Sequence, residues 1–367
     1  MTSHGQSVGG PAPSTGVGPT PGNERSTAGV LRTALSGRAR GAVAIGIATV
    51  VLFLISAVLA PQSVSGGAIS AMLPFAAILA VVAIGQTLVV QQGGIDLSVP
   101  GVFSLSVVVV TKLGASGTPG AILAAVLAAL AISAGAGAVS GFVVARLNVA
   151  PIVATLGMNA LLIGATWAVS EGAARRTPTG LSDVIGSTIL GVPVTVVVAV
   201  VLTIIVGVVV RLTPSGRIFE AVGANPRVAV AAGIAPLRYT LSAYSVAALL
   251  YAVAGVMLTG IVNTPGISEG NTYLLPSVAA VVLGGTSLLG GKGSVLASLI
   301  AAVFFTQVDR LASTLGLAYG WQILIQALAL GLGVAFHSGF RPGARLRSGP
   351  KRHAPAAEEP RASVEVP

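Results

Sequence analysis

The residues that could carry chemistry are few, and the most distinctive of them is Asp96. The sequence has no cysteine, which excludes disulfides, thiolate metal sites and a cysteine nucleophile. Its three histidines are His4, His337 and His353, all in the tails or at the end of the last apolar segment, so a histidine-centred catalytic or metal site is not expected. No paired nucleophile and base stands out elsewhere. We therefore expect no enzymatic activity, no bound metal and no cofactor.

Asp96 lies in a polar, glycine-rich stretch between two strongly apolar segments. The stretch runs from Gly85 to Gly101 with the sequence GQTLVVQQGGIDLSVPG. Beside membrane-spanning segments, such non-helical backbone persists only when it is buried in protein or lines a wet cavity. A charged carboxylate there costs a few kcal/mol unless it is paired or hydrated, which makes Asp96 a candidate functional residue. An equally weighted alternative places Asp96 at the water interface, as a cap of the helix that begins near Ser98 and Val99.

A second glycine-rich stretch, LGGTSLLGGKGS at residues 283–294, invites comparison with a phosphate-binding loop. That motif requires G-x-x-x-x-G-K-[ST] after a strand. Here the first glycine position holds Thr286, the hydroxyl position holds Gly293, and the flanks are apolar segments rather than a strand and a helix. We reject this stretch as a nucleotide site.

The composition is that of an integral membrane protein. Hydrophobic residues make up 54% of the chain and charged residues 8%, and the mean hydropathy is +0.92. A spanning helix needs about 20 apolar residues to cross a hydrocarbon core of ~30 Å. The apolar runs are residues 42–60, 69–90, 99–112, 121–145, 152–170, 191–210, 240–262, 275–289, 294–313 and 318–337. The sequence therefore predicts an all-α polytopic bundle of about ten transmembrane helices, occupying residues 41–338.

The formal charge of +10 is distributed like that of membrane flanks rather than of a nucleic-acid surface. Arginines precede the first apolar run and basic residues follow the last, a pattern that places both termini in the cytoplasm and favours contact with anionic lipid. Lys112, Arg175 and Arg176 then fall outside, against the trend. Residues 1–40 are rich in Gly, Pro, Ser and Thr, and residues 339–367 are basic and then Pro/Ala/Glu-rich, so we expect two disordered cytoplasmic tails.

One long cytoplasmic loop, residues 212–239, follows the sixth span. Its central part, TPSGRIFEAVGANPRVAVAAGI at residues 213–234, is rich in alanine and can form short helices with a small-residue surface. Gly223 and Asn225-Pro226 supply a break and a turn. Such helices suit docking into a groove on another subunit. The alternative is an amphipathic connector that lies on the membrane, with Arg217 and Arg227 facing lipid headgroups.

At these three segments the sequence resembles the permeases of ribose-type carbohydrate ABC importers, a family related to the permeases of autoinducer-2 and branched-chain amino acid importers. The likeness covers residues 42–337. GGIDLSV at 93–99 and GGTS at 284–287 match the family's stretches, and residues 216–234 follow its coupling loop, with Ala224 where glycine is usual. The chain departs at Pro100, where glycine is common, and at Arg227, where an acid often follows Asn-Pro.

The resemblance implies a permease subunit in the cell membrane that passes a sugar or sugar-like solute. It further implies a pair of permeases, either two copies or a copy and a sister chain, with a cytoplasmic ATPase subunit and an extracytoplasmic solute-binding protein. The solute stays open among pentoses, hexoses, inositol, furanosyl signal molecules and nucleosides. The rival interpretation is a secondary transporter driven by an ion gradient, which would use several intramembrane acids or bases. The candidates here are chiefly Asp96 and the adjacent Asp309 and Arg310, which could simply neutralise each other.

Two groups of site residues follow. The polar groups in or near the spans that we expect to line the solute path are Gln86, Gln91, Asp96, Ser98, Asn159, Asn271 and Tyr273. Gly94 and Pro100 are spaced as Gly270 and Pro276 are, a weak echo of the paired interrupted helices of inverted-repeat transporters. The residues that we expect to couple the chain to its ATPase are Gly216, Arg217, Glu220, Ala221, Gly223, Asn225, Pro226 and Gly233.

Overall fold

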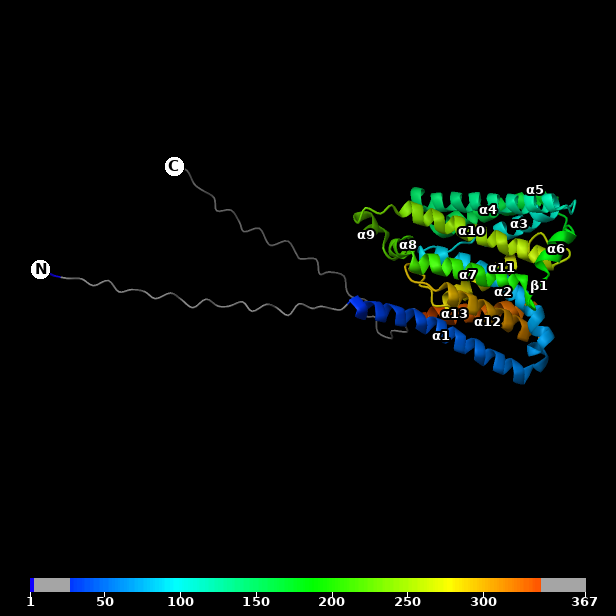
Figure 1. Cartoon of the computed structure of the whole chain (residues 1–367), viewed down its shortest axis with the longest axis horizontal. Helices are drawn as coiled ribbons and strands as arrows, with labels where there is room; N and C mark the ends of the chain where they lie inside the picture. Colours follow the sequence, from blue (N-terminus) through cyan, green and yellow to red (C-terminus); the bar gives the residue numbers. More distant parts are fainter. Residues whose placement is uncertain (3–26, 338–367) are drawn as a thin grey trace, which may run out of the picture.

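The computed structural model describes residues 1, 2 and 27–337 as a bundle of roughly parallel and antiparallel helices (Figure 1). Seven helices are long and apolar enough to cross a membrane, and α3 and α11 are shorter apolar helices. With α13 these make ten helices, in line with the predicted number of about ten, and the predicted all-α membrane fold is confirmed. Their bounds are α1 (Thr27–Leu59), α2 (Gly66–Gln91), α3 (Val99–Leu113), α4 (Pro119–Leu147), α5 (Pro151–Ser170), α7 (Val194–Leu212), α10 (Pro236–Ile261), α11 (Asn271–Leu283), α12 (Val295–Thr314) and α13 (Tyr319–His337).

Short elements mark the two ends of the bundle (Figure 1). One end carries α8 (Pro214–Ala224) and α9 (Pro226–Ala231), and we call it the α8 end. The opposite end, the α6 end, carries η1 (Pro61–Val64), α6 (Thr179–Ile185) and an antiparallel pair of two-residue strands, β1 (Thr188–Ile189) and β2 (Val192–Pro193).

The helix α1 starts at Thr27, earlier than the domain boundary predicted at residue 41. The segment between them, TAGVLRTALSGRAR, is rich in alanine, leucine and arginine, which are good helix formers and can continue a membrane helix beyond the lipid. The rest of the predicted N-terminal tail and the predicted C-terminal tail lie outside the described residues.

Hydroxyl caps set several of the helix starts. Ser65, Thr118 and Ser294 each accept a hydrogen bond from a backbone N–H in the first turn of α2, α4 and α12. Proline occupies the first or second position of α3, α4, α5, α8, α9 and α10, where its missing N–H leaves no bond unmade. The sequence thus specifies where the helices begin, although their apolar runs alone do not.

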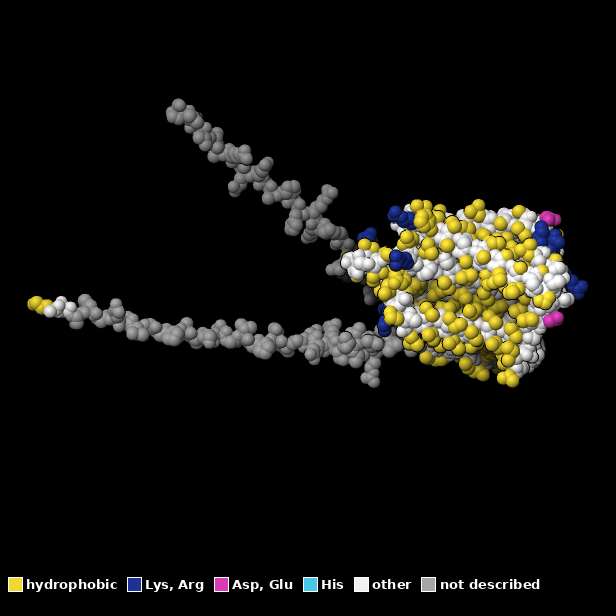
Figure 2. All heavy atoms as spheres, turned by 45° about the horizontal axis from the view of Figure 1, so that its top comes forward, with side chains coloured by type: hydrophobic (Ala, Val, Ile, Leu, Met, Phe, Trp, Pro, Cys, Tyr) yellow, Lys and Arg dark blue, Asp and Glu magenta, His cyan; other side chains and the backbone are white. Residues whose placement is uncertain are grey.

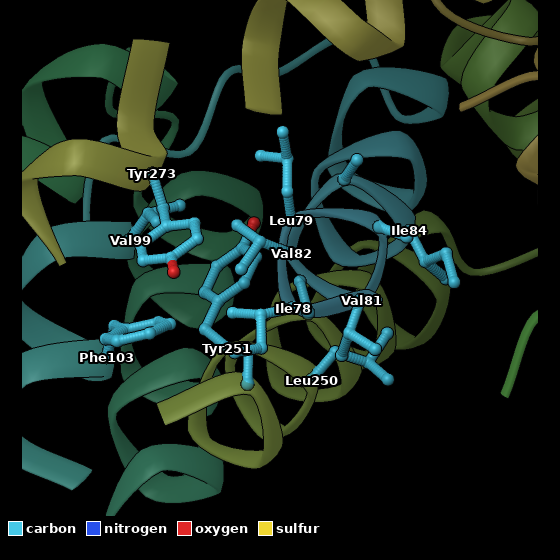
Figure 3. Close-up of a cluster of buried hydrophobic side chains, with 14 of the residues drawn as sticks. Ile78, Leu79, Val81, Val82, Ile84, Val99, Phe103, Leu250, Tyr251 and Tyr273 are labelled. Carbon is cyan, nitrogen blue, oxygen red and sulfur yellow. The ribbon is translucent and has the colours of Figure 1, made fainter. Parts of the chain in front are cut away.

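The core is built on α2 and α10. Their most apolar windows are 61% and 67% buried, against 11% for α1, which places these two helices at the centre and α1 at the edge. Figure 3 shows side chains of α2 such as Ile78 and Val82 packed against Leu250 and Tyr251 of α10. Glycines let α4 approach α10 closely, because a Cβ at Gly141 would lie 2.8 Å from the Cα of Leu241.

The outer surface fits a bilayer. Figure 2 shows a flank covered with hydrophobic side chains, with basic side chains at the α8 end and both basic and acidic side chains at the α6 end. Large exposed apolar residues such as Leu54, Leu127 and Ile204 belong to the helices of this flank. In water such a surface would drive aggregation, whereas in lipid it is solvated.

Candidate functional site

Residues 92–98 leave α2 and turn back into the bundle before α3 begins. Gly93 has a φ of +78°, a conformation that favours glycine at this turn. Gly94 then lies against the hydroxyl of Tyr244 and 3.3 Å, measured from an ideal Cβ, from the Cβ of Pro151. The non-helical backbone here is enclosed by α2, α5 and α10. Burial within the protein is what we expect of an interrupted segment beside membrane spans.

Asp96 is 1% exposed and bonds to the start of α3. Its Oδ1 accepts hydrogen bonds from the backbone N of Ser98 at 2.8 Å and from the Ser98 Oγ at 2.6 Å. This is the local geometry of an Asx turn, in which the side chain accepts from the backbone two residues on. Asp96 therefore fixes Ser98, the residue just before α3, from a buried position rather than from the water interface, and its carboxylate does not cap the N–H groups of the helix itself.

Gln86 holds the backbone of Asp96 from the side of α2. In the amide orientation that satisfies every neighbour, Gln86 donates to the Tyr251 hydroxyl at 2.8 Å and to the Asp96 backbone O at 3.3 Å, and it accepts from the Asp96 N at 3.2 Å. Both Gln86 and Tyr251 are fully buried. The break is thus fixed to the two central helices.

Two side chains of α5 hold the first turn of α3. The Thr155 Oγ1 accepts from the Leu97 N at 3.0 Å, and the Asn159 Oδ1 accepts from the Gly101 N at 2.8 Å. The first N–H groups of a helix have no partner within the helix, so Asn159 satisfies one of them. Thr155 was not predicted, because a lone threonine in an apolar run carries no signal in the sequence.

The starts of the short helices α3 and α11 meet. The Gly270 N donates to the Ser104 Oγ at 3.1 Å, and the backbone of Gly270 lies directly against Pro100. One turn on, the rings of Phe103 and Tyr273 stack with centroids 4.7 Å apart, side by side in Figure 3. The two segments with the same glycine-to-proline spacing in the sequence, one before α3 and one before α11, therefore lie together. The residues in contact are Pro100 of the first and Gly270 of the second. Asn271 is exposed beside them.

A cavity of about 370 Å³ opens between α2, α11 and α12, next to this meeting point. Phe75, Tyr273 and Pro276 form an apolar wall, whereas Thr272, Thr306, Asp309, Arg310 and Ser313 give it polar groups. Pockets of a few hundred Å³ with such mixed linings are typical small-molecule sites. The carboxylate of Asp309 accepts a 2.7 Å bond from Gln326, and among the described side chains it forms no ion pair with Arg310.

The loop between α11 and α12 closes on Gln91 and α8. The Gly291 N donates to the backbone O of Gln91 at 2.8 Å, and the backbone of Gly290 lies against the backbone O of Gly223. The Gln91 side chain is fully buried, packs against Gly293 and has no hydrogen-bond partner among the described residues. Gln91 therefore contacts α8 and the loop before α12, and it is not among the residues that bond to Asp96.

The predicted coupling residues divide into a buried and an accessible group. Gly216 and Gly223 are buried, Gly216 against the end of α7 and Gly223 against the backbone O of Gln91. Glu220 is half-buried. Arg217, Ala221, Asn225, Pro226 and Gly233 are exposed. Gly223 packs against its own chain and leaves no free surface there, while its part in coupling to the ATPase stays a prediction.

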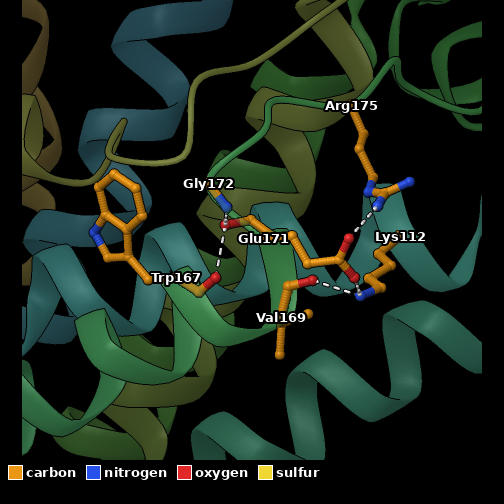
Figure 4. Close-up of polar contacts among 7 residues, drawn as sticks. Lys112, Trp167, Val169, Glu171, Gly172 and Arg175 are labelled. Carbon is orange, nitrogen blue, oxygen red and sulfur yellow. Dashed lines mark hydrogen bonds and ion pairs between the residues drawn. The ribbon is translucent and has the colours of Figure 1, made fainter.

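At the α6 end, one acid joins two helices (Figure 4). The Lys112 Nζ donates to a carboxylate oxygen of Glu171 at 2.8 Å and to the backbone O of Val169 at 2.7 Å, and Arg175 lies 3.9 Å from the other oxygen. The hydrogen bond from Lys112, its charge and that of Arg175 lower the pKa of Glu171 below its ordinary value of 4.5. The basic residues that departed from the predicted charge pattern are therefore partly neutralised.

In comparisons with known proteins, this chain matches one family of permeases, and the relatives reported below are named as permeases too. The family described as branched-chain amino acid transport system / permease component matches residues 68–334. The ribose import permease protein RbsC of Escherichia coli K12 is 33% identical over 293 residues, 78% of this chain and 91% of the relative. The autoinducer 2 import system permease protein LsrC of Enterobacter sp. 638 is 32% identical, covering 84% of this chain and 88% of the relative. The fructose import permease protein FruF of Bifidobacterium longum is 32% identical, covering 68% and 71%. No solved structure matches.

Proposed function

The chain belongs to the branched-chain amino acid transport system / permease component family, and from this premise we propose that it is the membrane subunit of an ABC importer for a sugar or sugar-like solute. The relatives named above are import permeases for ribose, fructose and autoinducer 2. In this proposal the chain passes the solute into the cytoplasm, a solute-binding protein delivers it, and a partner ATPase subunit supplies the energy.

One observation carries the proposal: the α8–α9 surface is joined directly to the interrupted helices. Gln91 and Gln92, at the end of α2, contact α8 on one side and lead into the break that holds Asp96 on the other. The loop before α12 contacts the same point through Gly290 and Gly291. A partner that moves α8 can therefore shift the break before α3 and the loop before α12 together without any nucleotide site in this chain.

The accessible surface for the ATPase includes small and apolar groups beside the exposed Arg217 and Arg227. Ala221, Asn225, Pro226, Val228 and Val230 are exposed on α8, α9 and the turn between them. Small residues permit close approach, and Val228 and Val230, 62% and 60% exposed, offer apolar area to bury. Neither valine was among the residues predicted from the sequence.

We assign the solute path to the cavity beside Tyr273 and to the meeting point of α3 and α11. Sugars need several hydrogen bonds and an apolar ring face, and this cavity combines hydroxyls, a carboxylate and a guanidinium with Phe75 and Tyr273. Asp96, Ser98 and Asn159 would support the path by fixing the start of α3 rather than by touching solute.

The orientation follows from charge. We place the α8 end in the cytoplasm and the α6 end outside, in the cell membrane, with both termini cytoplasmic and anionic lipid as a partner. A second permease copy or sister chain completes the path. The proposal includes no contact with nucleic acid.

Reconstitution tests this function against an ion-gradient carrier. The chain, its ATPase and its solute-binding protein are placed in liposomes with labelled ribose or fructose. We expect uptake that needs ATP and the binding protein and persists when ionophores collapse ion gradients. Uptake driven by a gradient without ATP would favour the secondary transporter.

A further inference from the structure

A second cavity lies under α8, away from the solute path. It has a volume of about 350 Å³ between α2, α7, α8 and α10, and its walls include Leu88, Val206, Val209, Val210, Phe219 and Val246. Nearly every lining group is apolar; the Ser242 hydroxyl already donates to the Tyr239 backbone O. Such a cavity offers water too few partners to hold it.

The cavity opens toward the lipid-facing flank. Val209 and Val246 line it and are themselves 48% and 38% exposed, as is Ile205 at 52%. Protein interiors are close-packed, and an unfilled apolar space forfeits the dispersion contacts of its walls. The surrounding hydrocarbon of the bilayer is the apolar material at hand to fill it.

Basic residues flank this cavity in the chain. The lining residues Gly216 and Tyr239 adjoin Arg217 and Arg238 in the chain, and both arginines are exposed. Arg211, next to the lining residue Val210, donates to the Ser294 Oγ at 3.1 Å. The acid of α8, Glu220, is half-buried and has an interaction of its own. Arg217 and Arg238 are thus exposed basic residues at the α8 end, where a headgroup of the same leaflet would lie.

We propose that one acyl chain of an anionic phospholipid occupies this cavity, with its phosphate held by Arg217 and Arg238. The proposal requires only that the chain lies in a membrane, so it stands apart from the transported solute. The lipid chain packs against Phe219, whose backbone O accepts the bond from Gln92. Bound lipid thus supports the position of α8 on the break.

The test uses lipid that quenches tryptophan fluorescence. Trp167 and Trp321, 57% and 59% exposed, are replaced by phenylalanine, and Val246→Trp places a reporter in the cavity wall. The purified full chain is measured in phosphatidylcholine vesicles that contain brominated phosphatidylglycerol or, separately, brominated phosphatidylcholine. Phe142→Trp, on the lipid-facing side of α4, is the matched control.

At the Val246→Trp reporter, we expect the apparent affinity for brominated phosphatidylglycerol to exceed that for brominated phosphatidylcholine by at least about fivefold. This is the ratio that the attraction of one arginine to an anionic lipid provides. The double change Arg217→Gln and Arg238→Gln should abolish that preference at Val246→Trp and leave the ratio at Phe142→Trp unchanged. Should Val246→Trp disturb folding, Phe219→Trp reports from the opposite wall. Equal quenching by the two lipids would overturn the assignment of an anionic headgroup. A cavity reporter shielded from both lipids, with the control quenched, would show a protein occupant instead.

Discussion

The side-chain Nε2 of Gln92 donates a 2.9 Å hydrogen bond to the backbone O of Phe219, joining the end of α2 to α8. Gln92 precedes the break that holds Asp96, and Phe219 lies at the centre of α8. This bond joins a surface helix to the segment that leads into the break, and in the proposed function it offers a route by which a movement of α8 would reach the start of α3.

Gln92→Ala should weaken this connection without unfolding the chain. A hydrogen bond of this kind contributes about 0.5–1.5 kcal/mol, small beside the packing of a ten-helix bundle. We expect the variant to insert and to bind its ATPase, while the stimulation of ATP hydrolysis by solute-loaded binding protein falls severalfold. Stimulation at the wild-type level would show that the movement travels by the loop before α12 instead.

Asp96→Asn and Asp96→Ala should differ in stability. The asparagine keeps an oxygen that can accept from the Ser98 N and Oγ, whereas alanine removes both bonds and leaves these buried donors without their acceptor. Leaving a buried donor unsatisfied costs about 1–3 kcal/mol. In thermal denaturation in detergent, the melting temperature of Asp96→Asn should lie near that of the wild type, and that of Asp96→Ala clearly below it. If uptake fails in both variants while Asn remains fully stable, the carboxylate charge itself serves transport.

The fold was accessible from sequence because lipid imposes simple rules. The lengths of the apolar runs predicted about ten spanning helices, and the glycine-rich stretches predicted the interruptions before α3 and after α11. The side-chain partners were not accessible. Nothing in the sequence distinguishes Tyr251, which bonds to Gln86, from other residues of an apolar helix, because its role depends on which helix lies opposite.

In the α8–α9 loop, too, the sequence does not show which small residue is exposed. Small residues at 221 and 223 look alike in sequence, yet Ala221 is exposed and Gly223 is buried against Gln91. A helix places residues two apart on different faces, and only the packing of α8 on α2 decides which face is free. The cavity near Tyr273 was also missed, since Asp309 and Arg310 were considered only as candidate ion-relay groups or as a pair that could neutralise each other.

The stability contributed by Glu171 should depend on pH. Its pKa is lowered in the folded protein, by the bond and charge of Lys112 and by the charge of Arg175, so its contribution is present above the ordinary pKa of 4.5. The contribution is lost as the pH falls through the lower folded pKa. Thermal denaturation of the wild type and Glu171→Gln should therefore differ slightly at pH 6 and converge in acid. A difference that grows on acidification would contradict the ion pair.

The proposed orientation can be tested with single cysteines, since the chain has none of its own. Ser187 and Ala232 are exposed at the α6 and α8 ends. On intact cells an impermeant thiol reagent should label Ser187→Cys and spare Ala232→Cys until the membrane is permeabilised. The reverse pattern would invert the orientation and remove α8 from the reach of a cytoplasmic ATPase.

Docking of the ATPase on α8 should be sensitive to charge at Ala221. Because Ala221 is exposed on α8 while its neighbours pack inward, Ala221→Glu should fold and insert normally. A new carboxylate in an apolar interface has no partner and is costly to desolvate. We expect Ala221→Glu to be recovered at the wild-type level and thermal stability, but to lose most co-purification with the ATPase subunit.

Gly223→Glu supplies the contrast, because its side chain would collide with the backbone O of Gln91 and with Gly291. That variant should lower the stability of the permease alone, so its loss of ATPase binding would follow from a displaced α8. Size-exclusion profiles and melting temperatures of the isolated permeases separate the two effects. If Ala221→Glu binds the ATPase and supports transport as the wild type does, α8 is not the docking helix. The exposed α9 valines, Val228 and Val230, would then be the next residues to change.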